Sequence, residues 1–141
     1  MSDAYRVTLR TVDGGPTALG VAGAHSLVVD RPAAAGGSGL GFNGGQLLYL
    51  AIAACWSNDL YREAAARGIT LHRVAVAVDG DFPGRGAASS EIRVDVQVEA
   101  DADDAALREL LAEVERVAEI PATLARPTTI AIHGEVNGQG R

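Results

Sequence analysis

The first third of the chain alternates short apolar and polar runs. From Tyr5 to Leu9 every second side chain is apolar, a pattern typical of an amphipathic strand. The elements predicted for this part are strands over 4–12, 17–22 and 25–30, a turn at Asp13–Pro16, and a Pro/Gly/Ala-rich loop over 31–45.

A long helix is expected after this loop. Asn43 is a candidate N-cap, Gln46 three residues later completes a capping box, and Gly68 suits the position that ends a helix. From Leu47 to Trp56 the side chains are apolar around the whole helix, which predicts burial on every side. From Ser57 to Arg67 the helix turns amphipathic and is expected to emerge toward solvent.

The remaining residues predict a hairpin, a helix and a last strand. These elements are strands over 69–79 and 91–99 around a loop over 80–90, a helix capped by Asp101 or Asp103 and interrupted at Pro121, a strand containing Ile130 and Ile132, and a frayed glycine-rich tail from Gly134. The order β-β-β-α-β-β-α-β places the strands in antiparallel groups. We therefore predict an α+β fold, with antiparallel sheets packed around a long central helix and a second helix.

Length and charge narrow the function classes. The 141 residues suit one domain over 1–141. Twelve basic and eighteen acidic residues give a net charge of −6, which makes a nucleic-acid or membrane partner unfavourable. The chain has no lysine, so Schiff-base chemistry is excluded and arginine is the only fixed cation.

Three features predict a cytoplasmic protein. The first six residues carry no signal-peptide pattern. The longest apolar run, Leu47–Trp56, is too short to span a bilayer. A single cysteine cannot form an intrachain disulfide, which is typical of a reducing compartment.

A glycine-rich motif and three histidines were considered as a cofactor site and a metal site, and we predict neither. Gly39 to Gly44 match G-x-G-x-x-G, but a dinucleotide site needs a strand directly before the first glycine, and residues 31–38 intervene. We interpret this segment as a flexible entry to the helix. His25, His72 and His133 fall on different predicted strands without ligand spacing.

Cys55, in the middle of the long helix, is the remaining candidate for chemistry. Asp59 follows one turn later and would hold the pKa of the thiol up, so reactivity would need an arginine close by. Arg31 and Arg62 are the available cations. The alternative is that Cys55 is a small buried apolar residue.

Several segments, taken together, carry a family pattern. They are Asp30-Arg31-Pro32, Gly36-Gly37, the run from Gly41 to Leu48, and Ala53-Ala54-Cys55. With the order of the predicted elements, they make nearly the whole chain resemble the OsmC/Ohr family of osmotically inducible and organic hydroperoxide resistance proteins. The resemblance implies an intertwined homodimer with active sites at the subunit interface. It also implies thiol-based reduction of organic hydroperoxides, in which a helix cysteine becomes a sulfenic acid, a second cysteine resolves it, and an Arg–Glu pair activates the first thiolate.

The functional residues of the family carry over only in part. Cys55 matches the attacking cysteine, but the resolving position falls on Ile120 and the family glutamate falls on Gly45. Arg31 is the nearest substitute for the activating arginine, although it lies off register. A sulfenic acid at Cys55 would therefore need an external thiol for its reduction.

Three hypotheses remain open. The first is a one-cysteine thiol peroxidase acting on organic hydroperoxides, with Cys55 as nucleophile, Arg31 as activator and an external thiol as reductant. The second is a non-catalytic family member that binds a small apolar ligand at the homodimer interface. The third is a regulatory dimer in which oxidation of Cys55 is the signal.

Overall fold

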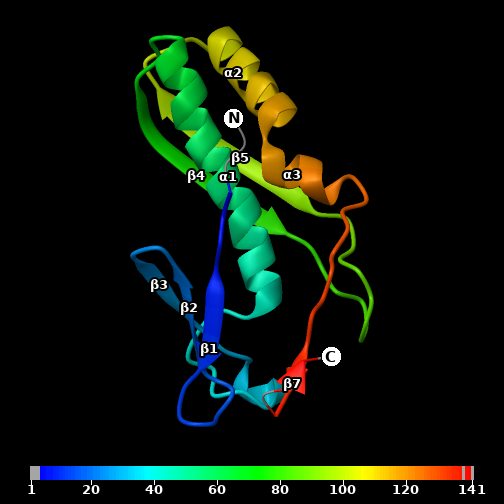
Figure 1. Cartoon of the computed structure of the whole chain (residues 1–141). Helices are drawn as coiled ribbons and strands as arrows, with labels where there is room; N and C mark the ends of the chain where they lie inside the picture. Colours follow the sequence, from blue (N-terminus) through cyan, green and yellow to red (C-terminus); the bar gives the residue numbers. More distant parts are fainter. Residues whose placement is uncertain (1–3, 138, 141) are drawn as a thin grey trace. The chain divides into compact units, whose positions relative to one another are not determined.

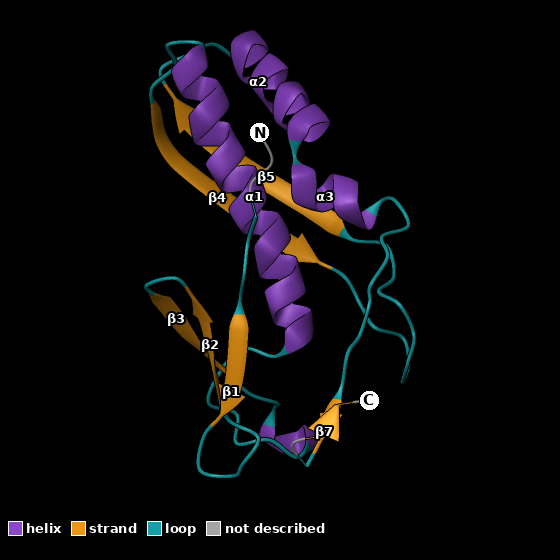
Figure 2. Ribbon diagram, in the orientation of Figure 1, coloured by secondary structure: helices purple, strands orange, loops and turns teal. Residues whose placement is uncertain are grey.

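The computed structural model describes residues 4–137 and 139–140. Its elements are β1 (Thr8–Thr11), β2 (Ala18–Ala22), β3 (His25–Val29), the 3-10 turn η1 (Ala33–Ala35), α1 (Gly44–Ala66), β4 (Leu71–Asp79), β5 (Arg93–Ala100), α2 (Asp104–Val117), α3 (Glu119–Leu124), β6 (Glu135–Val136) and β7 (Gln139–Gly140). Figures 1 and 2 show this mixture of helices and sheets, which confirms the predicted α+β class.

The chain divides into two compact units. The first contains the residues up to 51 and those over 79–92, and the second contains residues 52–78 and those from 93 onward. Helix α1 takes part in both, since its first turns belong to the first unit and the rest, from Ile52, to the second.

The first unit is built on the antiparallel sheet β1-β2-β3. Thr8 lies opposite Val21, and Ala18 lies opposite both Thr11 and Val29. The predicted turn is present, because Gly15 N donates to Val12 O at 3.1 Å. The three strands therefore lie where the alternation placed them, with the first one shortened to residues 8–11.

Asp30, directly after β3, organises the loop that leads to α1. Its carboxylate is buried and accepts hydrogen bonds from the Thr17 hydroxyl at 2.8 Å and from the backbone N–H of Arg31, Ser38 and Leu40 at 2.7–3.3 Å. Burial acts to raise the pKa of Asp30, but these four donors outweigh it and hold the pKa below its ordinary value. One side chain thus fixes a loop that the sequence analysis predicts to be flexible.

Two glycines of the G-x-G-x-x-G segment are required by the backbone of the same loop. Gly39 has a φ of 67°, in the left-handed region. A Cβ at Gly41 would collide with the carbonyl of Val28, and Phe42 pairs with Val29 in a parallel bridge. The backbone of the loop thus accounts for these two glycines.

The signals that begin and end α1 are confirmed. Gln46 N donates to Asn43 Oδ1 and Asn43 N donates to Gln46 Oε1, both at 2.9 Å, which is the reciprocal pairing of a capping box. Gly68, after the last turn, has a φ of 67°. Asp103 is the N-cap of α2, since its carboxylate accepts from Ala106 N at 2.8 Å.

The second unit holds the main core. Leu60 and Ala64 of α1 pack with Leu110 and Val114 of α2, and all four are fully buried. Partly buried residues surround them: Trp56, Ile69, Leu71, Val74, Val96, Val98, Leu107 and Leu111. Strands β4 and β5 form the sheet of this unit. The residue before β4 pairs with the residue after β5, since Asp101 N donates to Thr70 O at 3.0 Å.

Two predicted features are wrong. The apolar half of α1 is not covered on every side, since Leu50 is 46 % exposed and Ala51 and Ala54 are exposed. The residues around Ile130 and Ile132 form no strand, and these side chains are 82 % and 87 % exposed. Both patterns need a covering surface or a pairing strand, and the described part of this one chain supplies neither there.

The glycine-rich tail is also more regular than expected. Strand β6 pairs antiparallel with β7, and Glu135 lies opposite Gly140. No helix among the described residues is long and apolar enough to cross a membrane.

Asp30→Asn should destabilise the protein at neutral pH. The amide group would present two N–H donors to a site filled with donors, so part of the network must break. We expect the thermal midpoint at pH 7 to fall by several degrees, measured by circular dichroism. Because the pKa of Asp30 is lowered by folding, its stabilising effect is present above about pH 4 and is lost as the pH falls through the folded value. The gap between wild type and variant should therefore shrink in acid, and a gap that stays constant down to pH 2 would contradict this role.

Candidate functional site

Cys55 lies on α1, five residues before Leu60 and nine residues before Ala64, the two core residues of this helix. Those two residues face α2, and their packing fixes the rotation of the helix. The thiol is partly exposed rather than enclosed.

Two carboxylates lie next to this sulfur. The Cys55 Sγ is 3.6 Å from Asp59 Oδ2, one helical turn along α1, and 3.9 Å from Glu119 Oε2, at the start of α3. Asp59 is buried, and its other oxygen, Oδ1, binds the Arg62 guanidinium at 2.9 Å. Arg62 also contacts Glu63 at 3.1 Å, so one arginine serves two carboxylates.

These surroundings favour the protonated thiol. Burial is the largest cause that raises the pKa of Cys55, and the charge of Asp59 and its hydrogen bond with the thiol raise it further. The backbone N–H groups of Ile120 and Glu119 act in the opposite direction but do not outweigh these effects. The prediction that Asp59 holds the thiol pKa up is confirmed.

Glu119 is a residue of the site that was not predicted from the sequence. The helix α2 ends at Val117, and the buried Ala118 turns the chain so that Glu119 begins α3 beside the sulfur. The hydrogen bond from the Thr123 hydroxyl to the Glu119 carbonyl, at 2.7 Å, holds this first turn. The one available signal was that Glu119 precedes Ile120, the position of the resolving cysteine in the family pattern.

Arg31, the predicted activator, lies in the other unit. It is exposed, and its backbone takes part in the Asp30 loop, since Arg31 N donates to Asp30 and Arg31 O accepts from Gly39 N at 3.0 Å. Its action on Cys55 stays a prediction. Within the second unit, the guanidinium linked to the thiol is that of Arg62, through Asp59.

The space beside Gly45, which aligns with the glutamate of the family pattern, is filled by another side chain. A Cβ built there would lie 3.0 Å from Phe82 Cε2. The Phe82 ring stacks on Tyr49 with 5.9 Å between ring centroids, and the Tyr49 hydroxyl is 2.8 Å from Ser89 Oγ. Phe82 and Ser89 belong to the loop after β4, so this aromatic pair holds that loop against the first turns of α1.

Metal ligation has one candidate set among the described residues. Cys55, Asp59 and Glu119 offer ligand atoms within 4.8 Å of one another. The Arg62 guanidinium already neutralises Asp59, and the thiol is held protonated, so the set is not arranged for a cation. Of the histidines, His72 pairs with Asp101 at 2.7 Å on the surface.

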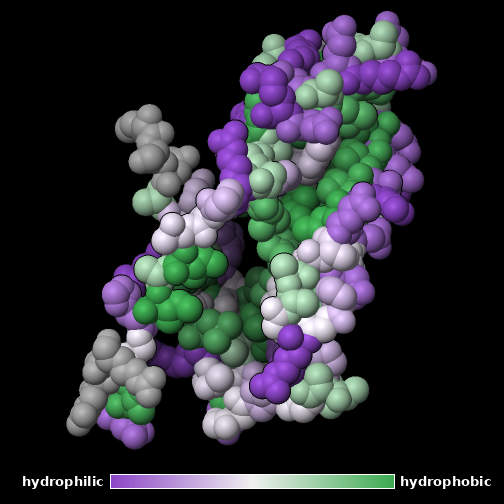
Figure 3. Space-filling view, turned by 90° about the vertical axis from the view of Figure 1, so that its right-hand side faces the viewer, coloured by the Kyte–Doolittle hydropathy of each residue, from purple (hydrophilic) through white to green (hydrophobic). Residues whose placement is uncertain are grey.

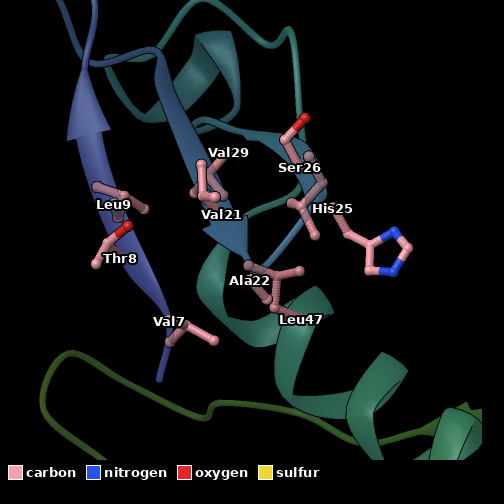
Figure 4. A pocket seen from close by; sticks show the side chains of 11 residues that line it. Val7, Thr8, Leu9, Val21, Ala22, His25, Ser26, Val29 and Leu47 are labelled. Carbon is pink, nitrogen blue, oxygen red and sulfur yellow. The ribbon is translucent and has the colours of Figure 1, made fainter. Parts of the chain in front are cut away.

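The first unit contains an apolar hollow of about 390 Å³. It is lined by Val7, Thr8, Leu9, Gly20, Val21, Ala22, His25, Ser26, Leu27, Val29 and Leu47. Figure 4 shows Val21 and Val29 facing the residues of β1, while the His25 imidazole points away from them. Seven of its eleven lining residues are aliphatic, which suits an apolar ligand or an apolar protein surface.

Comparisons with known proteins identify the family to which this chain belongs. The family model for OsmC-like proteins matches residues 36–133. The chain belongs to the OsmC-like family. A search of curated protein sequences gives no match.

Solved structures of this family share the fold. An OsmC-like protein from Mycoplasma pneumoniae is 19 % identical, with a TM-score of 0.75 over 89 % of each chain. The organic hydroperoxide resistance protein OhrB of Bacillus subtilis is 24 % identical, with a TM-score of 0.57 over 86 % of this chain and 90 % of that one. A Vibrio cholerae protein assigned to organic hydroperoxide resistance, solved with captopril in one active site, is 25 % identical, with a TM-score of 0.56 over 100 % and 97 %.

Asp59→Asn should lower the pKa of Cys55. The amide keeps the shape of the side chain but removes the charge that favours the protonated thiol. The pH midpoint of alkylation by iodoacetamide should move down, and the rate at pH 7.5 should rise roughly threefold or more. Asp95→Asn, an exposed change on β5, is the matched control and should leave the midpoint in place. An unchanged or higher midpoint in Asp59→Asn would contradict this assignment.

Proposed function

We propose that this protein is a one-cysteine thiol peroxidase that reduces organic hydroperoxides through Cys55 and is recycled by an external thiol. The single observation that carries the proposal is the polar surroundings of a partly exposed Cys55 sulfur. A cysteine that only fills space would have an apolar shell. Family membership and relatives named for hydroperoxide resistance support the same activity.

The reaction has three balanced steps. The Cys55 thiolate attacks the distal oxygen of the hydroperoxide, the O–O bond breaks, and the alkoxide takes a proton and leaves as an alcohol. The sulfur is now a sulfenic acid. One external thiol displaces its oxygen as water to give a mixed disulfide, and a second releases the Cys55 thiol and a small disulfide.

Asp59 sets the pH dependence of the first step. Its Oδ2 is the acceptor that the thiol proton faces, so the protonated form dominates near neutral pH. Because the thiolate is the nucleophile, the rate of oxidation rises with pH until the raised pKa of Cys55 is passed. Arg31, in the loop that follows β3, remains the proposed activator of Cys55.

A homodimer is part of the proposal. Large exposed apolar side chains occur in both units: Tyr5, Val7, Leu9, Leu40, Tyr61, Ile130 and Ile132 are each at least half exposed. Figure 3 shows broad apolar areas on the face toward the viewer. A chain that leaves so much apolar surface in water gains from association with a second copy.

Cumene hydroperoxide should oxidise Cys55 faster than it oxidises a free thiol. Corrected for thiolate fraction, we expect an advantage over N-acetylcysteinamide of about a hundredfold or more, because the site positions the peroxide. Stopped-flow fluorescence measures it, since Trp56, the only tryptophan, directly follows Cys55. Cys55→Ser should show no fast phase. A Cys55 rate no greater than that of the free thiol would end the proposal.

The alternative is a non-catalytic member that binds a small apolar ligand at the homodimer interface. The aliphatic hollow of the first unit favours it. We expect Val21→Glu to reduce both self-association, measured by sedimentation velocity, and binding of the apolar dye 1,8-ANS, because it places a charge in the hollow. Cys55→Ala should keep both. Dye binding that Val21→Glu leaves intact would contradict a ligand role for this hollow.

A further inference from the structure

The charges around Cys55 are unevenly balanced. Of the two carboxylates at the sulfur, Asp59 is buried and paired with Arg62 at 2.9 Å. Glu119 is exposed, and its carboxylate forms no ion pair within 4 Å with any described residue. Glu63 and Arg67, the next charges along α1, pair with each other at 2.9 Å. Of the two carboxylates at the sulfur, Glu119 is therefore the one without an ion-pair partner among the described residues.

The position of this charge matters for anything that reaches the sulfur. Glu119 Oε2 lies 3.9 Å from the Cys55 Sγ, and a reacting molecule must bring its own atoms to within bonding distance of the same sulfur. A charged group on that molecule therefore comes within about one Debye length of the Glu119 carboxylate, where salt screens the interaction only in part. The Thr123 hydroxyl donates to the Glu119 carbonyl at 2.7 Å, which holds the backbone from which this carboxylate projects.

We propose that Glu119 makes the Cys55 site select its reaction partners by charge, admitting neutral and cationic thiols and neutral hydroperoxides and repelling anionic ones. The inference rests on the proposed function for its biological meaning, because it names the chemical class of the external reductant. The class is a thiol without a carboxylate near its sulfur. The charge selection itself needs only a reactive, accessible thiol.

A matched pair of alkylating reagents tests the selection. Iodoacetamide is neutral and iodoacetate is anionic, and both react with the thiolate by forming an S–C bond while iodide leaves. Since both need the thiolate, the ratio of their rates cancels any change in the pKa of Cys55. At low ionic strength we expect the iodoacetamide-to-iodoacetate ratio to be about fivefold higher for Cys55 than for N-acetylcysteinamide.

Glu119→Gln should bring this ratio to within about twofold of the free thiol, because it removes the charge and keeps the shape. Glu109→Gln is the control, since it changes the net charge equally at an exposed position on α2 and should leave the ratio high. Adding 1 M salt to the wild type should lower the ratio toward that of the free thiol, because the Debye length falls to about 3 Å.

The same variants test the reductant class. Oxidised Cys55 should be reduced faster by cysteamine and 2-mercaptoethanol than by mercaptoacetate, and Glu119→Gln should narrow the difference. A wild-type alkylation ratio equal to that of the free thiol, or one unchanged in Glu119→Gln, overturns the inference. A Cys55 that reacts with neither reagent overturns both it and the peroxidase. Charge selection without fast oxidation by cumene hydroperoxide leaves the inference standing and removes only the peroxidase.

Discussion

The site at Cys55 depends on the packing of α1 against α2. Four side chains form this contact: Leu60, Ala64, Leu110 and Val114. These four side chains exclude water completely, and burying each of the larger ones stabilises the fold by roughly 1.5–3 kcal/mol. Helix faces locked in this way leave no freedom of rotation. Cys55 therefore emerges on the side where the chain leaves α2, and the start of α3 is held beside its sulfur.

The resulting site differs from an arginine-activated thiol in its electrostatics. A guanidinium beside a thiol favours the thiolate, whereas within the second unit the Cys55 sulfur lies next to two carboxylates and the Arg62 guanidinium is bound to one of them. A protonated thiol resists chance oxidation and metal capture. The cost is a small reactive fraction at neutral pH.

Local rules made much of the fold predictable. The capping box at Asn43 and Gln46, the cap at Asp103 and the glycine after α1 depend on residues a few positions apart, and the structure confirms each. The contact of Cys55 with Glu119 joins residues 64 positions apart and follows from core packing rather than from any local pattern. The prediction of a strand around Ile130 was wrong for a related reason. An alternating sequence pattern indicates an apolar face, but it does not identify the chain or strand that covers this face. The long helix shows the same limit at Leu50.

The stack of Phe82 on Tyr49 also limits which side chain position 45 can carry. Because the Phe82 ring lies where a side chain at position 45 would begin, a glutamate there requires the ring to move, and the ring is held by Tyr49, which in turn is tied to Ser89. A Gly45→Glu substitution would therefore disturb the aromatic pair of Tyr49 and Phe82. The space around position 45 thus favours a residue without a side chain, and the carboxylates found at the Cys55 sulfur among the described residues are those of Asp59 and Glu119.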